Sequence, residues 1–161
     1  MSINRNPQPY ASPEQMLEWA NSIMSSREPD LLIGPRDDPY MRRWWVVPRN
    51  EMQNCYLHEI LHSDDDRALH DHPFANTSVV IDGSYIEHTP EGQFTRTAGD
   101  VVTREPEALH RLELIGKRAV TLFFTGPVVR QWGFDCPQGW IPAYEFVDPS
   151  QPGQRGRGCG E

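Results

Sequence analysis

Apolar residues near the N-terminus recur at intervals of three and four, which is the period of an amphipathic helix. They are Met16, Trp19, Ala20, Ile23 and Met24. The segment Ser12-Pro13-Glu14-Gln15 stands directly before this run. It combines an N-cap serine, a proline at the first helical position and a glutamine at the third, which together form a capping box. The pattern predicts one helix over residues 13–25, whose aromatic stripe packs against the rest of the protein.

From Met41 onward the pattern changes to short alternating runs separated by turn residues, which is typical of β-strands. A linker over residues 29–39, with Gly-Pro and Asp-Asp turn signals, separates these runs from the helix. The strands are predicted at 42–47, 55–61, 76–82, 84–89, 93–97, 100–104, 109–115 and 119–125. Their regular spacing predicts an all-β fold, an antiparallel barrel of two packed sheets with one N-terminal α-helix.

Aromatic-rich segments follow the last predicted strand. Large aromatic side chains bury the most area per residue, so we expect four of them to pack over the sheet: Trp132, Phe134, Trp140 and Phe146. The tail from Pro149 lacks core formers and is expected to be disordered. The chain is therefore divided into an N-terminal arm and helix (1–40), a β-barrel (41–148) and a disordered tail (149–161).

Composition supports this division and excludes some partners. A length of 161 residues fits one domain, and 15 prolines with 12 glycines favour many short strands joined by turns. The formal net charge of −8 argues against nucleic acid or an anionic membrane as partner. We find no apolar run of about eighteen residues and no secretory leader. Three widely spaced cysteines, Cys55, Cys136 and Cys159, lead us to expect reduced thiols in a cytoplasmic protein.

His70 and His72 stand two positions apart in an extended segment. Because side chains alternate along a strand, both imidazoles are expected on the same face, where they begin a metal site. A third ligand must come from elsewhere, and His110 in a short alternating run is the best candidate. Neutral imidazoles suit divalent transition metals, and three of them leave coordination positions open for water or a small-molecule substrate.

The segment around these two histidines resembles the first motif of the cupin superfamily. His70, His72 and Gly83 match its two histidines and its closing glycine at the correct spacing. Asp64 stands where the motif begins with glycine, and Asn76 stands where it has a glutamate ligand. The resemblance therefore implies a metal site that lacks the usual carboxylate, with Asn76 near the metal.

The second cupin motif is matched by Gly99 and His110 at the correct spacing. Its inner proline and glycine are out of register, and Leu114 replaces its asparagine. The resemblance covers about residues 50–127. It implies the cupin double-stranded β-helix, a jelly-roll barrel, with metal ligands from both motifs.

A small cupin with three histidine ligands, as expected here, resembles the thiol dioxygenases. This resemblance implies a non-haem Fe(II)-dependent dioxygenase-like enzyme acting on a small anionic or thiol-bearing molecule. Fe(II) is the favoured cofactor, and Zn, Ni or Mn are alternatives. Without a carboxylate ligand the metal keeps its double charge, which favours an anionic or chelating ligand. One alternative is a redox-neutral metal-dependent isomerase or hydrolase in which Tyr85 or His58 carries protons. Another is a non-catalytic small-molecule-binding cupin, and a homodimer would be ordinary for this architecture.

Five further features have a weaker claim on the site. The acidic turn at residues 63–66 is expected to be a solvated loop. Glu87 could be a fourth ligand, but it shares strand parity with Tyr85 rather than with a histidine. Arg67, Arg111 and Arg130 could pair with a substrate carboxylate, although Arg111 adjoins His110 and so should point to the opposite face.

Overall fold

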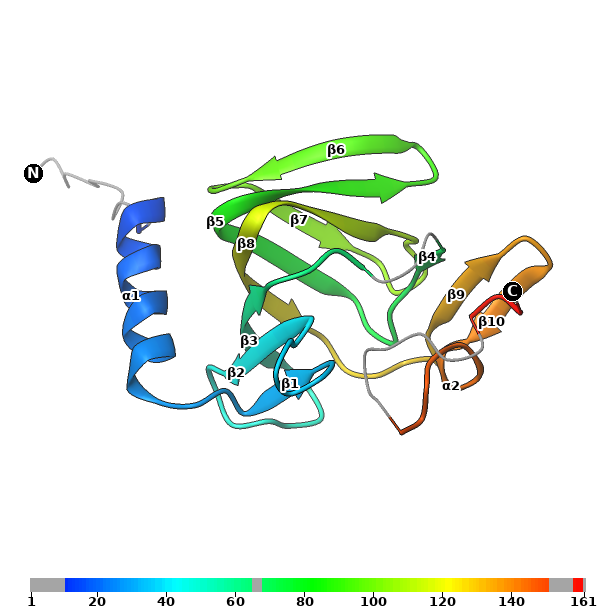
Figure 1. The fold of residues 1–161 in the computed structure, drawn as a ribbon, viewed down its shortest axis with the longest axis horizontal. Coiled ribbons are helices and arrows are strands. Elements are labelled where there is room, and N and C mark those ends of the chain that lie inside the picture. The colour runs from blue at the N-terminus through cyan, green and yellow to red at the C-terminus, as the bar shows by residue number, and fades with distance from the viewer. Residues whose placement is uncertain (1–10, 65–67, 151–157, 161) are drawn as a thin grey trace, which may run out of the picture.

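The computed structural model describes residues 11–64, 68–150 and 158–160 (Figure 1). These residues form two helices, α1 (Pro13–Ser26) and the single turn α2 (Ala143–Phe146). They also form ten strands: β1 (Leu31–Ile33), β2 (Met41–Trp45), β3 (Asn54–Ile60), β4 (Leu69–His70), β5 (Asn76–Thr89), β6 (Gly92–Thr97), β7 (Val101–Arg104), β8 (Arg111–Thr125), β9 (Gly133–Cys136) and β10 (Gly139–Pro142). No helix in this part of the chain is long and apolar enough to cross a membrane.

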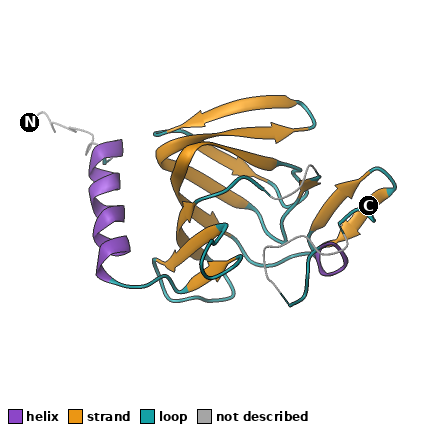
Figure 2. Cartoon of the chain, in the orientation of Figure 1, coloured by secondary structure: helices purple, strands orange, loops and turns teal. Residues whose placement is uncertain are grey.

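The strands form two antiparallel sheets. Six strands of the larger sheet follow the order β1-β2-β3-β8-β5-β6, and β7 pairs with β5 beside them. The smaller sheet has the order β10-β9-β4. Figure 2 shows strands dominating the chain, with one long helix standing beside the barrel at its N-terminal end. The prediction of an all-β antiparallel barrel with one N-terminal helix is confirmed.

The two longest strands, β5 and β8, are continuous where we expected breaks. The pairing of β5 with β8 is irregular on both sides of Asp82, which marks a β-bulge. Gly83 has a φ of 73°, and a Cβ there would lie 2.2 Å from the carbonyl oxygen of Arg118. The Asp-Gly pair between the predicted strands 76–82 and 84–89 therefore forms a bulge rather than a turn, since a glycine with positive φ is compatible with both features. The bulge bends β5, so that its two halves pair with different partner strands, β7 and β6.

Helix α1 forms as predicted. The Ser12 hydroxyl accepts from the Gln15 N–H, and the Gln15 side chain accepts from the Ser12 N–H, which completes the capping box. The helix buries Ala20 in a core cluster with residues of β2, β3, β5 and β8, including Trp44 and Leu57. Trp19 is 38% exposed, so the predicted aromatic stripe does not bury all of its members.

The smaller sheet and the C-terminal segments beside it share a hydrophobic cluster of their own. The rings of Phe134 and Phe146 are stacked with centroids 3.6 Å apart, as the predicted packing role requires. Trp140, in contrast, is 42% exposed. A disulfide joins Cys136 to Cys159, so the expectation that all three cysteines are reduced thiols is wrong. Cysteine spacing alone could not give this bond, because the fold must first bring the tail back to β9.

Two predicted boundaries also change. The linker after the helix contains β1, which pairs with β2, so the larger sheet begins before residue 41. The tail is not disordered at Gly158–Gly160, where the disulfide and a hydrogen bond from the Gly158 N–H to the Phe146 carbonyl hold it. The remainder of that predicted tail, 151–157 and 161, lies outside the described residues.

Candidate metal centre

A cavity of about 510 Å³ lies within the barrel. Most of its lining residues are apolar, and they include Met41 on β2, Ile60 on β3, Leu112 and Phe123 on β8, and Phe134 on β9. Its polar lining includes all three candidate metal ligands, His70, His72 and His110. An apolar pocket with a few convergent polar groups is the usual form of a small-molecule site.

Backbone pairing brings the three histidines together from distant positions in the chain. The N–H groups of His70 and His110 each donate to the other residue's carbonyl, at 2.8 and 2.9 Å. His72 follows β4 and donates its N–H to the Pro106 carbonyl at 3.0 Å. One ring nitrogen from each histidine can be chosen so that all three lie within 4.8 Å of one another. The structure therefore places the predicted ligands at one point of the cavity wall.

The environment of His70 and His72 keeps both of these imidazoles neutral. Burial lowers the pKa of His70 to about 4, with nearby Asp64 opposing the shift. Burial also holds the pKa of His72 well below its usual range, and His70 and His110 add to this effect. Neutral imidazoles have a free lone pair at pH 7, which is the form that binds metals.

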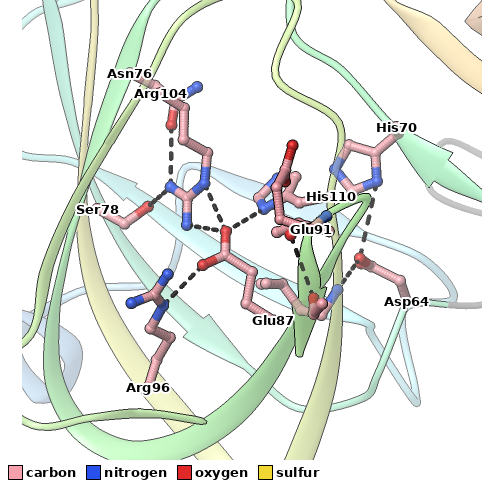
Figure 3. A network of polar contacts seen from close by, with 12 residues as sticks. Asp64, His70, Asn76, Ser78, Glu87, Glu91, Arg96, Arg104 and His110 are labelled. Carbon is pink, nitrogen blue, oxygen red and sulfur yellow. Dashed lines mark hydrogen bonds and ion pairs between the residues drawn. The ribbon is translucent and has the colours of Figure 1, made fainter. Parts of the chain in front are cut away.

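A buried carboxylate orients His110 (Figure 3). Glu87, on β5, accepts a hydrogen bond from Nδ1 of His110 at 2.9 Å and another from Nε of Arg96 at 2.8 Å. Arg104 donates to the same carboxylate through Nε at 2.7 Å and through Nη2. Because Nδ1 of His110 is the donor, Nε2 carries the lone pair that can bind a metal.

Glu87 is thus held away from the fourth-ligand role considered for it. Its side chain is 1% exposed. Burial alone would raise its pKa, but the hydrogen bond from His110 and the charge of Arg104 bring the pKa down to about 2. The carboxylate therefore stays ionised and engaged by three partners. Its parity with Tyr85, which lines the cavity, was the sequence signal that could have placed Glu87 at the site.

Asp64 occupies a similar place beside His70. Its carboxylate accepts hydrogen bonds from the Tyr40 hydroxyl and, at 2.6 Å, from the Leu112 N–H. Nδ1 of His70 lies 3.8 Å from the same carboxylate, beyond hydrogen-bond distance but close enough for attraction. The expectation of a solvated acidic loop is therefore wrong for Asp64, whose side chain is 12% exposed. Residues 65 and 66 lie outside the described residues.

Nδ1 of His72, in the triad, is a buried polar atom without a hydrogen-bond partner among the described residues, and so is Nδ2 of Asn76, which lies outside the cavity lining. Such groups are rare because each costs about 1–3 kcal/mol, and they often mark a site that an ion or water completes. Two metal–imidazole bonds of about 2.1 Å at a tetrahedral or octahedral angle place their nitrogens about 3.0–3.4 Å apart. An ion would thus draw the most distant nitrogens closer, and the donor set of three imidazoles is one that divalent transition metals accept.

This chain resembles known proteins in its structure. No protein-family model matches the chain, and no curated protein does. Solved structures do. A double-stranded β-helix protein from Klebsiella pneumoniae is 19% identical, with 64% of this chain and 90% of that one covered and a TM-score of 0.49. A cupin-2 domain protein from Shewanella frigidimarina is 9% identical (67% and 91% covered, TM-score 0.48), and a Bordetella pertussis cupin domain is 20% identical (55% and 94%, 0.43). Each of these proteins is less than 25% identical to this chain and similar to it over part of its length.

The two residues considered for proton transfer both line the cavity of this barrel. Tyr85 is 1% exposed, and burial raises the pKa of its phenol. His58 accepts a hydrogen bond at Nε2 from Nε of Arg43, at 2.9 Å. Burial and the charge of Arg43 hold the pKa of His58 well below its usual range. His58 is therefore a neutral imidazole whose acceptor nitrogen is already engaged.

The remaining candidates lie outside the cavity lining. Asn76 accepts from Nη1 of Arg104 at 3.4 Å and is not among the residues that line the cavity. Arg111 donates to His88 at 3.3 Å, and Arg130 pairs with Asp71 at 2.6 Å. Arg67 lies outside the described residues. Among the described residues, the arginines that do line the cavity are Arg43 and Arg104, neither of which we considered from the sequence.

Proposed function

We propose that this protein is a metal-binding cupin that holds a divalent transition metal, Fe(II) in its native state, through His70, His72 and His110. We further propose that it acts as a dioxygenase-like enzyme on a small anionic or thiol-bearing molecule. The observation that carries the proposal is the meeting of three imidazoles in the wall of a largely apolar cavity of about 510 Å³. Three nitrogen ligands leave coordination positions open, which separates a catalytic site from a structural one.

The protein's own residues prepare the site. Glu87 fixes the His110 ring with Nδ1 protonated, and Asp64 lies beside His70. Apolar side chains such as Phe123 line the cavity and exclude water, which strengthens electrostatic interactions inside it. When bound, Fe(II) supplies redox chemistry and open positions at which a substrate and dioxygen can meet.

The charge of the site supports an anionic substrate. Glu87 and Asp64, the carboxylates nearest the triad, are engaged by arginine, tyrosine and backbone donors. A metal held by neutral ligands alone keeps its double positive charge. A ligand that brings a thiolate or carboxylate would neutralise that charge in a low-dielectric cavity.

A redox-neutral isomerase or hydrolase is the second candidate, and Tyr85 is the observation that favours it. Its phenol lines the cavity, and burial raises its pKa, so it stays protonated at neutral pH and can donate a proton. Oxygen consumption separates the two functions, because a hydrolase or isomerase consumes none.

The metal proposal is tested by elemental analysis of protein purified without oxygen from its own host. We expect one iron per chain in the wild type and almost none in a His70→Ala/His110→Ala variant. The matched control is His62→Ala/His88→Ala, which also removes two imidazoles but takes them from hydrogen bonds with Asp38 and Glu113 outside the cavity lining. Equal metal in all three proteins would refute the site.

The activity is tested with the iron-loaded protein in an oxygen electrode, using small thiols and carboxylic acids as candidate substrates. The dioxygenase proposal expects oxygen uptake that depends on both iron and substrate. Conversion of a substrate without oxygen uptake would instead establish the redox-neutral function.

A further inference from the structure

Arg43 is a cation in the cavity wall without a carboxylate partner among the described residues. It lies on β2, directly opposite His58 on β3. Its Nε donates to Nε2 of His58 at 2.9 Å, and its guanidinium lies over the Tyr56 ring, 4.8 Å from the centroid. Both partners are uncharged, since His58 is a neutral imidazole. The positive charge of Arg43 is therefore not neutralised by the protein groups it contacts.

The other cavity arginine makes the contrast clear. Arg104 also lines the cavity, but its charge is neutralised by Glu87. An arginine has five N–H donors, and the bond to His58 uses one of those on Arg43. Its two terminal nitrogens carry the other four N–H donors, and none of these has a hydrogen-bond acceptor among the described residues. Two adjacent nitrogens of this kind match the two oxygens of a carboxylate.

The cavity connects Arg43 to the histidine triad along an apolar wall. The Phe123 ring lies next to both the Arg43–His58 pair and the triad. Its centroid is 5.2 Å from that of His58 and 5.9 Å from that of His72. Met41 and Ile60, also from β2 and β3, line the same cavity. A small molecule could therefore touch the triad at one end and Arg43 at the other, with an apolar body against Phe123.

We infer that Arg43 is the anion-recognition residue of this cupin, and that it binds the carboxylate of a small acid whose apolar body crosses Phe123 towards the triad. His58 is the positioning residue that holds the Arg43 guanidinium. The inference deepens the proposed function, since it rests on that site for the ligand's other end. A carboxylate suits Arg43 better than a phosphate dianion, because one arginine without an acidic partner supplies a single positive charge.

The inference is tested by titrating the full-length protein with 3-phenylpropanoate and with its neutral amide, 3-phenylpropanamide, followed by ligand-observed NMR. Each titration is made on protein as purified and on protein treated with a chelator. We expect the wild type to bind the acid at least about tenfold more tightly than the amide in both states, because charge-assisted hydrogen bonds are strong. Arg43→Gln should reduce this preference to within about twofold, with acid binding weakened more than amide binding.

Arg42→Gln is the matched control. Arg42 is the neighbour of Arg43 on the same strand, but it pairs with Glu59 and does not line the cavity. This variant removes the same charge and should keep the preference for the acid. Arg43→Lys keeps the charge without the planar fork and should give an intermediate preference. Thermal unfolding of each variant establishes that it is folded.

His58 has its own test. His58→Gln retains an acceptor for Arg43 and should keep most of the preference, whereas His58→Leu should lose roughly three- to tenfold of it. Equal binding of acid and amide by the wild type, or an unchanged preference in folded Arg43→Gln, would overturn the inference. A wild type that prefers the acid but binds no metal would refute the proposed metal function alone.

Discussion

Replacing Glu87 by glutamine should destabilise the protein and weaken metal binding together. The side chains of Glu87 and Arg104 are 1% and 5% exposed, so solvent does not screen their interaction. Removing one partner of a buried ion pair costs about 3–5 kcal/mol. Glutamine keeps an acceptor oxygen, and Arg104 keeps its 3.1 Å hydrogen bond to Ser78. We therefore expect the free energy of unfolding to fall by about 2–4 kcal/mol.

Metal affinity should fall by roughly 10- to 100-fold in the same variant, because Glu87 orients the ring of His110. Urea unfolding of the metal-free protein and competition with a metal-binding dye measure the two effects separately. The control is Glu113→Gln, which removes a carboxylate that is 49% exposed and bonded to His88. A surface pair of this kind contributes at most about 1 kcal/mol, and the control should bind metal as the wild type does.

A double variant separates lost charge from lost packing. In Glu87→Gln/Arg104→Met no buried charge is left uncompensated, so it should be more stable than additivity predicts by at least about 1 kcal/mol. The reasoning is refuted if Glu87→Gln unfolds within about 0.5 kcal/mol of the wild type and retains wild-type metal affinity.

Three further predictions concern the fold. Reduction of the Cys136–Cys159 disulfide, which closes a separation of 23 residues, should lower the free energy of unfolding by about 3 kcal/mol, and coincident urea curves with and without reductant would contradict this. Gly83→Ala should cost more than about 3 kcal/mol because its Cβ would meet a backbone oxygen, whereas Gly116→Ala, with φ of 80° and open space, should cost about 1–2 kcal/mol; equal losses of thermal stability would disprove the steric cause. Ser12→Ala should cost about 1 kcal/mol by removing the helix cap, measured by urea unfolding, and no change would show that the cap contributes nothing.

The sequence predicts that three histidines meet because part of the signal is local. Spacing alone places His70 and His72 together, and the position of His110 in an alternating run makes it the best third candidate. The structure brings all three together, although β4 covers only Leu69–His70. Mutual backbone hydrogen bonds between His70 and His110, rather than a long strand, hold the site.

The residues around the ligands could not be predicted in the same way, because their roles depend on which strands become neighbours. Glu87 has the expected parity, but its function requires β6 to bring Arg96 and β7 to bring Arg104 to either side of a bent β5. Arg43 adjoins another arginine, and nothing local tells which of the two enters the cavity. The bend at Gly83 could not be predicted for the same reason, since Asp-Gly is compatible with either a turn or a bulge.

X-ray absorption of the iron- or cobalt-loaded protein tests the central claim most directly, because it counts the atoms bound to the metal. The account predicts one ion per chain with three imidazole nitrogens at about 2.0–2.2 Å and the remaining positions filled by oxygen. A spectrum with fewer than two imidazoles, or with protein sulfur bound to the metal, would contradict it.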